Sequence, residues 1–265
     1  MPRPAAPVRK VGRPKGHGPE YATRREAIID IAAQLFARKG YHAVGIAELC
    51  DKAKIGRGSL YYYIGSKEQL LIDIQARAMD PLLANSRLVA GLDTSPVVKL
   101  RLVSQTLLDT IVHALPYVWV YEHEVRALRG RQREKFLAPR RDFEGIVREL
   151  FAECREAGLL HVDDDHLATL MFLNLHNHTY QWVNPQGAWQ STELSRQYCT
   201  TLFTGMATDR VDMAAVEREM AAFTGALRWQ REPHPDHEPV PGRQRGRRLP
   251  GTPATRPARR QPSPS

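Results

Sequence analysis

No stretch of this sequence is apolar for long enough to cross a membrane, although 42% of its 265 residues are hydrophobic. Its N-terminus has basic residues but lacks the apolar segment of a secretory signal peptide. Cysteine is also scarce, since Cys50, Cys154 and Cys199 are odd in number and far apart. This pattern disfavours a disulfide framework and indicates a reducing compartment. The sequence therefore predicts a cytoplasmic protein without a membrane partner.

The motifs of common catalytic chemistry are absent as well. The chain has no glycine-rich phosphate loop, no nucleophile elbow and no pair of Glu-x-x-His motifs for a di-iron bundle. His176 and His178 lie two positions apart, so on a helix their side chains point about 200° apart and do not share a metal ion. We therefore expect no catalytic residue, no metal and no cofactor, and an all-α enzyme is kept only as a weaker alternative.

Positive charge is concentrated at the two ends of the chain. Residues 1–20 contain five basic residues and one acidic residue, residues 231–265 contain eight arginines and three acidic residues, and the sequence between them is neutral. Both ends are rich in Pro and Gly and poor in large apolar side chains, which predicts a disordered basic arm at 1–20 and a disordered tail at 230–265. Such tails improve solubility or contact a polyanion, and the composition leaves both functions open.

The sequence after the basic arm predicts four helices in close succession. Residues 28–36 place apolar side chains on one helical face, and Gly40 follows as a typical C-terminal stop. A second short helix is expected over residues 46–53, with a break at 54–56 and a third short helix from Arg57 to Tyr63. A fourth begins at Ser66, where S-x-x-Q has the form of a capping box.

Two short helices joined by a tight turn and braced by a longer one form a helix-turn-helix unit. We expect Leu60 and Tyr63 to face inward and to hold the third helix against the first. Donors for phosphates and base edges are then left on its outer side, and Lys67 adds positive charge at the start of the fourth helix. The expected outward residues of the third helix are Arg57, Ser59, Tyr61 and Tyr62.

These helices carry a recognisable series of residues. Residues 32–36 read AAQLF, residues 40–41 read GY, and residues 58–70 read GSLYYYIGSKEQL. In this order and spacing, residues 24–71 resemble the DNA-binding domain of the TetR (tetracycline-repressor-like) family. The chain departs from the family pattern at Val44-Gly45, where a capping Thr or Ser is usual, and at Lys54 and Gly56 in the turn. Two of the family's phosphate contacts are therefore not expected, and Lys54 is the candidate to replace one of them.

The basic arm contains Gly12-Arg13-Pro14, which resembles the core of an AT-hook, although the arginine before the glycine is missing. In such a motif an extended arginine enters a narrow A·T minor groove. Arg13 is accordingly a candidate DNA contact, with loose attraction to phosphates as the alternative.

Residues 74–229 are expected to be helical throughout, with neither repeats nor an excess of basic charge. Ser95-Pro96 predicts an N-cap followed by a first-turn proline. Further helices are expected near residues 141–156 and 192–206. The acidic run at 163–165 is expected to cap another helix, and a metal site there is the weaker alternative.

The resemblance to the TetR family implies that residues 21–73 bind DNA and that residues 74–229 form a larger helical domain for ligand binding and dimerisation. The fold expected is all-α. A homodimer is also expected on physical grounds, because one short reading helix contacts few base pairs and specificity generally requires two half-sites. Candidate ligand-binding residues, chosen as aromatic or polar side chains in this domain, are His113, Tyr117, Trp119, Tyr121, Phe143, Phe151, Phe172 and Trp182.

The segment 182–187 is similar to a tryptophan-containing turn of family members that respond to acyl-CoA thioesters, and the arginines between 126 and 141 could bind CoA phosphates or form a solvated charged surface. The sequence thus predicts a homodimeric repressor that a small hydrophobic effector releases from a double-stranded DNA operator, with an acyl-CoA thioester as the candidate effector. The main alternative is a DNA-binding architectural protein without an effector.

Overall fold

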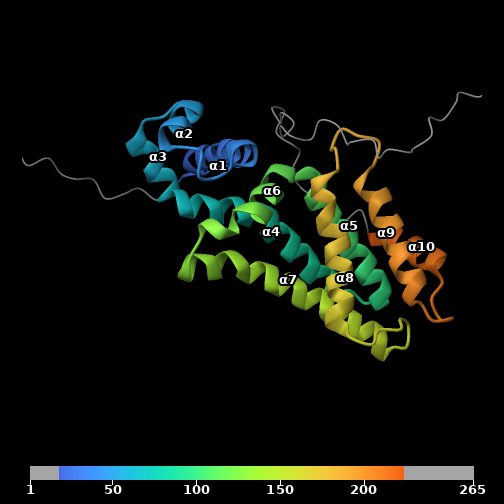
Figure 1. The fold of residues 1–265 in the computed structure, drawn as a ribbon. Coiled ribbons are helices and arrows are strands. Elements are labelled where there is room, and N and C mark those ends of the chain that lie inside the picture. Colours follow the sequence, from blue (N-terminus) through green and yellow to red (C-terminus); the bar gives the residue numbers. More distant parts are fainter. Residues whose placement is uncertain (1–17, 224–265) are drawn as a thin grey trace, which may run out of the picture.

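The computed structural model describes residues 18–223, and this part of the chain is built from α-helices joined by short turns (Figure 1). The expected all-α fold is confirmed. Arg13, most of the expected N-terminal arm and the expected C-terminal tail lie outside the described residues. No helix within 18–223 is long and apolar enough to cross a membrane. The helices are α1 Pro19–Lys39, α2 Ile46–Ala53, α3 Arg57–Ile64, α4 Lys67–Ala90, α5 Pro96–His113, α6 Leu115–Glu124, α7 Gly130–Glu156, α8 Asp165–Asn177, α9 Ser191–Met206 and α10 Met213–Phe223, with 3-10 turns η1 Val125–Ala127 and η2 His178–Gln181.

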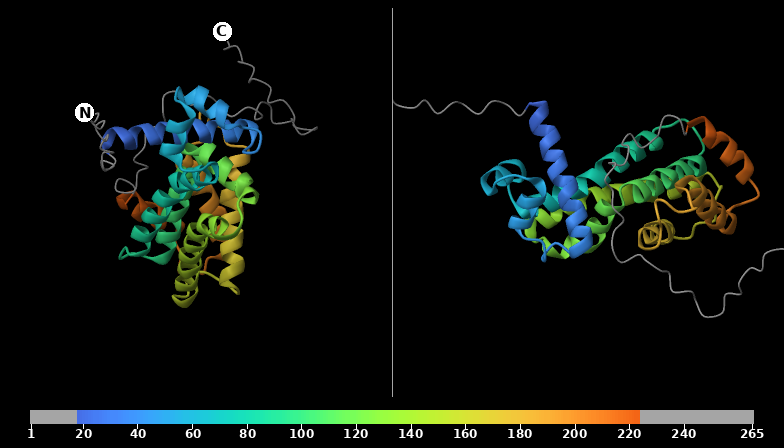
Figure 2. Two further views of the ribbon diagram at one scale, coloured as in Figure 1. Left: turned by 90° about the vertical axis from the view of Figure 1, so that its left-hand side faces the viewer. Right: turned by 90° about the horizontal axis from the view of Figure 1, so that it is seen from above.

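Helices α1, α2 and α3 form a small head at one end of the molecule (Figures 1 and 2). Their apolar faces meet in a core that fully buries Ile28, Leu49 and Leu60. Gly40 follows the last residue of α1, as the sequence predicts. Its φ is 83°, a conformation that glycine adopts at little energetic cost. Lys54 ends α2 in the left-handed conformation, with φ 53°. The helix-turn-helix unit expected from the sequence is therefore present.

Side chains of α1 satisfy the carbonyl groups at the ends of the two short helices. The Arg24 guanidinium donates to the carbonyl of Ala53 at the end of α2, at 2.9 Å. Arg25 Nε donates to the carbonyl of Tyr63 in the last turn of α3, at 3.2 Å, and its Nη2 also bonds Asp73 of α4. The last carbonyls of a helix have no partner within the helix. These bonds therefore fix both short helices relative to α1.

Helix α4 connects the head to the larger helical part. The Ser66 hydroxyl accepts a hydrogen bond from the Gln69 backbone N–H at 3.0 Å, which confirms the predicted cap. The helix then continues through residue 73 without a break, so the expected boundary between residues 73 and 74 falls inside α4. It packs against α5, α6 and α7. A displacement of α5, α6 or α7 can therefore be transmitted to the head through α4, which is continuous between the two parts.

Helix α5 lies at the centre of the larger part and is buried along most of its length, in contact with α4, α7, α9 and α10 (Figure 2). Pro96 occupies its first turn as expected, but the Ser95 side chain forms no capping bond. The expected cap of α8 is confirmed, because Asp164 accepts from the Leu167 N–H at 2.9 Å. Helix α7 begins at residue 130, eleven positions before the start expected near residue 141, and contains Pro139.

Candidate DNA interface and ligand cavity

Helix α3 presents its polar side chains to solvent. Arg57, Ser59, Tyr61 and Tyr62 are exposed, with Tyr62 60% accessible, and the buried Leu60 anchors the helix from behind. The expected partner of Leu60 was Tyr63, but Ile64 takes the second fully buried position. Tyr63 is only half-buried and stacks on Tyr21 of α1, with ring centroids 5.0 Å apart. The outward orientation expected for the four α3 residues is present.

The turn before α3 adds a cation to the same surface. Lys54 is exposed and follows α2, directly before residues 55 and 56. The guanidinium carbon of Arg57 lies 6.0 Å from the centre of the Tyr61 ring, which places both side chains side by side. Neither Gly45 nor Gly56, the residues preceding α2 and α3, provides a side-chain cap, in agreement with the departures from the family pattern.

Lys67 is oriented differently from the other candidate DNA contacts. Its ammonium group donates to the Tyr41 carbonyl at 2.6 Å and lies 4.1 Å from the centre of the Tyr41 ring. Burial lowers the pKa of Lys67, and the nearby Glu68 and Glu124 oppose the change. In this conformation the side chain supports the loop after α1, so contact with a phosphate would require it to turn outward.

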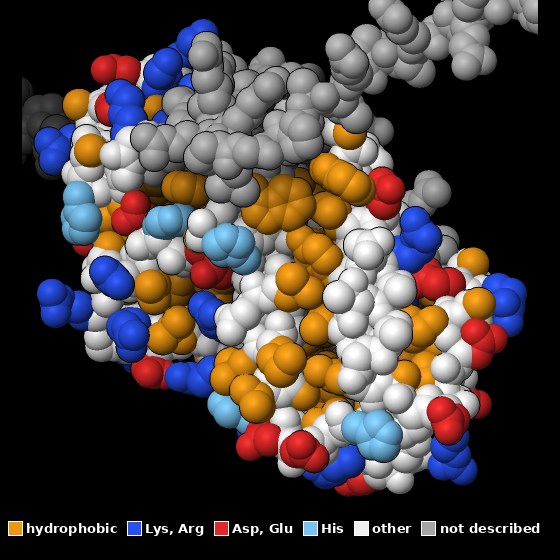
Figure 3. All heavy atoms as spheres, turned by 45° about the vertical axis from the view of Figure 1, so that its right-hand side comes forward, with side chains coloured by type: hydrophobic (Ala, Val, Ile, Leu, Met, Phe, Trp, Pro, Cys, Tyr) orange, Lys and Arg blue, Asp and Glu red, His pale blue; other side chains and the backbone are white. Residues whose placement is uncertain are grey.

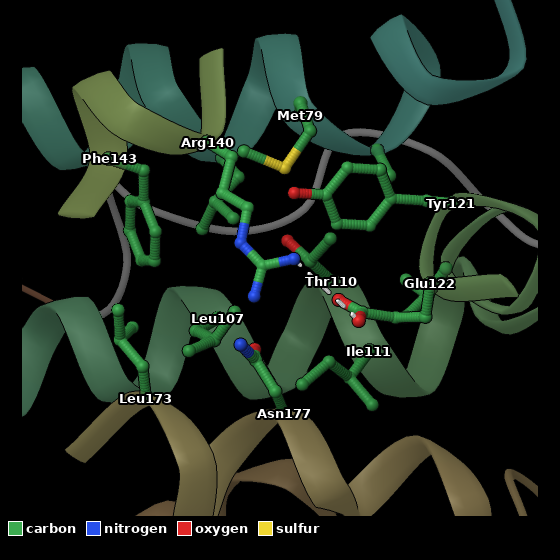
Figure 4. A pocket seen from close by; sticks show the side chains of 13 residues that line it. Met79, Leu107, Thr110, Ile111, Tyr121, Glu122, Arg140, Phe143, Leu173 and Asn177 are labelled. Atoms are coloured by element: carbon green, nitrogen blue, oxygen red, sulfur yellow. Dashed lines mark ion pairs between the residues drawn. The ribbon is translucent and has the colours of Figure 1, made fainter. Parts of the chain in front are cut away.

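A cavity of about 40 Å³ lies between α4, α5, α6, α7 and α8 (Figure 4). Of the candidate ligand-binding residues, Tyr121 and Phe143 line it. Its walls are mainly apolar, with polar groups concentrated around Arg140, which is a usual composition for a small-molecule site. The lining residues are Ala78, Met79, Leu82, Leu107, Thr110, Ile111, Val118, Tyr121, Glu122, Arg140, Phe143, Leu173 and Asn177.

The other six candidates do not line this cavity. Phe151 and Phe172 pack against each other in the core, edge to face. The Tyr117 hydroxyl bonds Asp30 of α1, and Trp119 stacks on His123 at 4.1 Å. Solvent reaches His113 and Trp182. The sequence could supply aromatic and polar candidates, but not which of them are buried or face a common cavity.

Arg140 and Glu122 form the charged part of the cavity wall. Arg140 Nη1 lies 3.9 Å from Glu122 Oε2, and the Arg140 side chain is 46% exposed, which places it at the cavity mouth. Burial raises the pKa of Glu122, and Arg140 opposes part of this rise. Burial also raises the pKa of Tyr121. Arg140 was expected either as a contact for CoA phosphates or as part of a solvated charged surface, and its position in the cavity wall had no signal in the sequence.

Helix α6 belongs to both the cavity and the contact with the head. Val118, Tyr121 and Glu122 line the cavity. On the same helix, Tyr117 bonds Asp30, and Glu124 Oε1 accepts a hydrogen bond from the Tyr41 backbone N–H at 3.0 Å. A ligand that moves α6 would therefore also act on α1 and on the loop that follows it.

The face that includes α8 carries exposed apolar side chains. Leu167 and Met171 are one turn apart on α8 and are 57% and 46% accessible. Trp182 and Trp189, in the segment after η2, are 46% and 55% accessible. Figure 3 shows apolar side chains spread over one face of the molecule. Large exposed apolar side chains in such number are typical of interaction surfaces.

Among residues 18–223, no group of three or more His, Cys, Asp or Glu side chains could hold a metal ion. The three cysteines are unpaired, and burial raises the pKa of both Cys154 and Cys199 to about 12, so these thiols stay protonated at neutral pH. The described part of the chain offers a helix-turn-helix head with an exposed, polar α3 and a separate, mainly apolar cavity.

Comparison with known proteins places both parts in one family. The family model of bacterial regulatory proteins, tetR family, matches residues 28–74, and a model of the tetracyclin repressor-like C-terminal domain matches residues 93–206. The transcriptional repressor KstR2 of Rhodococcus jostii is 29% identical over 191 residues, which are 69% of this chain and 91% of that protein. KstR2 of Mycolicibacterium smegmatis is 25% identical over 73% of this chain and 96% of its own length. The crystal structure of AibR in complex with isovaleryl coenzyme A and operator DNA has a TM-score of 0.62 and 25% identity, covering 68% of this chain and 98% of that one.

Proposed function

Since the chain belongs to the TetR family of bacterial transcriptional regulators, we propose that it is a homodimeric repressor released from a double-stranded DNA operator by a small hydrophobic effector. The observation that carries this proposal is the combination of an exposed, donor-rich α3 with an apolar cavity, joined through α4 and α6. Repression is supported by the similarity to KstR2, which is named a repressor. The cytoplasm is the proposed location because the operator is there.

In the proposed complex, the N-terminal half of α3 enters the major groove. Arg57 then contacts phosphates or a guanine edge, while Ser59, Tyr61 and Tyr62 donate to phosphates and base edges. Lys54 and a reoriented Lys67 add phosphate contacts on either side of α3. Arg13 would reach the adjacent minor groove from the preceding arm. Such a set of contacts makes binding steeply dependent on salt.

Two copies are needed to present two reading helices to adjacent half-sites. We assign the dimer interface to α8 and α9, with Leu167 and Met171 of α8 at its centre. Burial of these exposed side chains against a second copy removes apolar surface from water, which favours association.

For the effector, the similarity to AibR and the turn at 182–187 support an acyl-CoA thioester. In this proposal the acyl group enters the cavity, and the exposed arginines of α7, Arg131, Arg133 and Arg141, bind the phosphates. The cavity of about 40 Å³ is small, so a bound acyl group must displace its walls. Displacement of α6 would pull on Asp30 and Tyr41 and change the spacing of the two heads. A coupling of about 1–3 kcal/mol would weaken operator binding about 5–150-fold.

The test starts with the DNA that the purified protein retains from fragmented genomic DNA. We expect sequencing to return a pseudo-palindromic site, and gel shifts to show that isovaleryl coenzyme A or a related thioester releases it. Little sequence preference, together with unchanged affinity under all metabolites, would instead support an architectural protein. Turnover of a substrate without DNA binding would support an enzyme.

A further inference from the structure

The buried Tyr121 hydroxyl has no acceptor for its proton among the described residues, and the Arg140 guanidinium beside it can only donate to its oxygen. The side chain is only 7% exposed, and the hydroxyl points into the cavity (Figure 4). Buried polar side-chain atoms nearly always have a partner, and an exception requires an explanation. Because this group lines a cavity, its natural partner is a molecule bound there.

The neighbouring side chains do not accept the Tyr121 proton. Arg140 extends into the same space, with its guanidinium carbon 5.9 Å from the centre of the Tyr121 ring, but a guanidinium only donates hydrogen bonds. The Thr110 hydroxyl donates to the Thr106 carbonyl of its own helix, at 2.9 Å, and forms no hydrogen bond with the Tyr121 hydroxyl. Tyr121 and Arg140 therefore present two sets of donors to one space, with apolar walls on the other sides.

We propose that the cavity binds an uncharged, mainly apolar group of the effector, whose carbonyl oxygen accepts hydrogen bonds from the Tyr121 hydroxyl and the Arg140 guanidinium. A carbonyl oxygen has two lone pairs and can accept both. This inference rests on the proposed function, in which the cavity holds the effector, and it specifies the chemical group by which the effector is recognised.

The bound group is expected to be neutral, because the negative charge of Glu122 already balances the positive charge of Arg140. Glu122 lies 3.9 Å from Arg140, so a carboxylate ligand would bring a second anion to one cation, in a cavity that is otherwise apolar. Burial raises the pKa of Tyr121, so its hydroxyl keeps the proton and acts as a donor at neutral pH. A ketone, ester or thioester meets these conditions, whereas a free acid does not.

The test compares three small probes that share a five-membered ring on the full-length protein: cyclopentanone, methylenecyclopentane and cyclopentanecarboxylate. The first two differ only in that a carbonyl oxygen is replaced by CH₂. In protein-observed NMR titrations at pH 7 we expect cyclopentanone to bind about tenfold more tightly than methylenecyclopentane, as one hydrogen bond to a buried donor implies. Cyclopentanecarboxylate should bind more weakly than the ketone.

Tyr121→Phe removes only the hydroxyl and should reduce the preference for the ketone to less than about threefold, while binding of methylenecyclopentane is retained. The matched control is Thr110→Val, which also removes a hydroxyl from the cavity wall, but one that is already bonded. It should leave the preference unchanged. A Tyr121→Phe protein with an unchanged thermal midpoint shows that any loss of preference is local.

Equal binding of ketone and methylene probe by the wild type, failure of both to bind, or tighter binding of the carboxylate would overturn the inference. Operator binding is measured on the same samples by gel shift. If DNA is bound but the ketone preference is missing, only this inference fails. If the ketone preference is present but no DNA is bound, the carbonyl site stands and the proposed function fails.

Discussion

Arg101 of α5 and Glu217 of α10 form a two-point ion pair, in which Nε lies 2.6 Å from Oε1 and Nη2 lies 3.2 Å from Oε2. The Arg101 side chain is almost completely buried, and that of Glu217 is 28% exposed. The two residues are 116 positions apart in the sequence. This pair joins the last described helix to the central helix of the domain.

A directed chain of hydrogen bonds continues from Arg101 into the core. His176 Nδ1 is 2.7 Å from the Phe172 carbonyl, which only accepts, so Nδ1 carries the proton. Nε2 therefore accepts from the Ser104 hydroxyl at 2.7 Å, and Ser104 accepts from Ser195 at 2.8 Å. Ser195 in turn accepts from Arg101 Nη1. The chain fixes α5, α8, α9 and α10 relative to one another and requires a neutral His176.

Glu217→Gln should destabilise the protein by about 1–3 kcal/mol, because the buried Arg101 guanidinium would lose its counter-charge. Urea unfolding at pH 7 measures the free-energy difference. Glu219→Gln, on the same helix, is the matched control: Glu219 is exposed and should change the stability by no more than about 0.5 kcal/mol. Equal effects of the two variants would show that the ion pair contributes no particular stability.

Protonation of His176 should destabilise the fold. Burial lowers the pKa of His176 to about 4, whereas an unfolded histidine titrates near 6.5. As the pH falls from about 6.5 to about 4, the unfolded state takes up a proton that the folded state does not. This histidine's contribution, complete above pH 6.5, therefore decreases over that range by roughly 3 kcal/mol and levels off below it.

The measurement is the free energy of unfolding as a function of pH, for the wild type and for His176→Gln. The glutamine variant is less stable at pH 7 but should lack this part of the pH dependence. The exposed His113 provides the control, because His113→Gln should keep the wild-type slope. Parallel curves for wild type and His176→Gln would contradict the neutral, buried state of His176.

The elements that the sequence predicted correctly have local causes. The caps of α4 and α8 need only Ser66 with Gln69 and Asp164 with Leu167, three residues apart, and the same holds for the glycine stop after α1. The start of α7 was missed because residues 131–135 are all charged or polar and show no apolar period. Such a segment becomes helical because the helix that follows it packs against the rest of the domain. The apolar periodicity of the segment itself does not reveal this packing.

The site was less predictable than the fold because it depends on contacts between distant residues. Phe143 lines the cavity, whereas Phe151, two turns later on the same face of α7, packs in the core. Which of them meets a cavity depends on where α7 crosses α4 and α8. A buried arginine such as Arg101 is likewise unexpected from the sequence, because its partner Glu217 is far along the chain.

Arg57→Ala should weaken operator binding and make it less dependent on salt. Loss of one phosphate contact reduces the slope of log K against log salt concentration by about 0.9. Fluorescence anisotropy with a labelled operator, between low and moderate salt, gives both quantities. Arg87→Ala is the charge-matched control, since Arg87 lies at the far end of α4 and pairs with Asp142. If both variants show the wild-type slope, Arg57 does not contact a phosphate.

Met171→Glu should convert the proposed dimer to monomers. Met171 and Leu167 are exposed on one face of α8, and in a symmetric interface each copy would place its glutamate near that of the other. Two like charges in an apolar interface oppose each other and lose their hydration, so we expect the dimer dissociation constant to rise at least about 100-fold. Light scattering after size exclusion measures the mass. Leu88→Glu, at a 65% exposed position of α4, should leave the mass unchanged.

Since one reading helix contacts few base pairs, the Met171→Glu monomer should also lose operator binding while keeping its helical circular dichroism. A monomeric wild type, or a Met171→Glu variant that remains dimeric at micromolar concentration, would place the interface elsewhere.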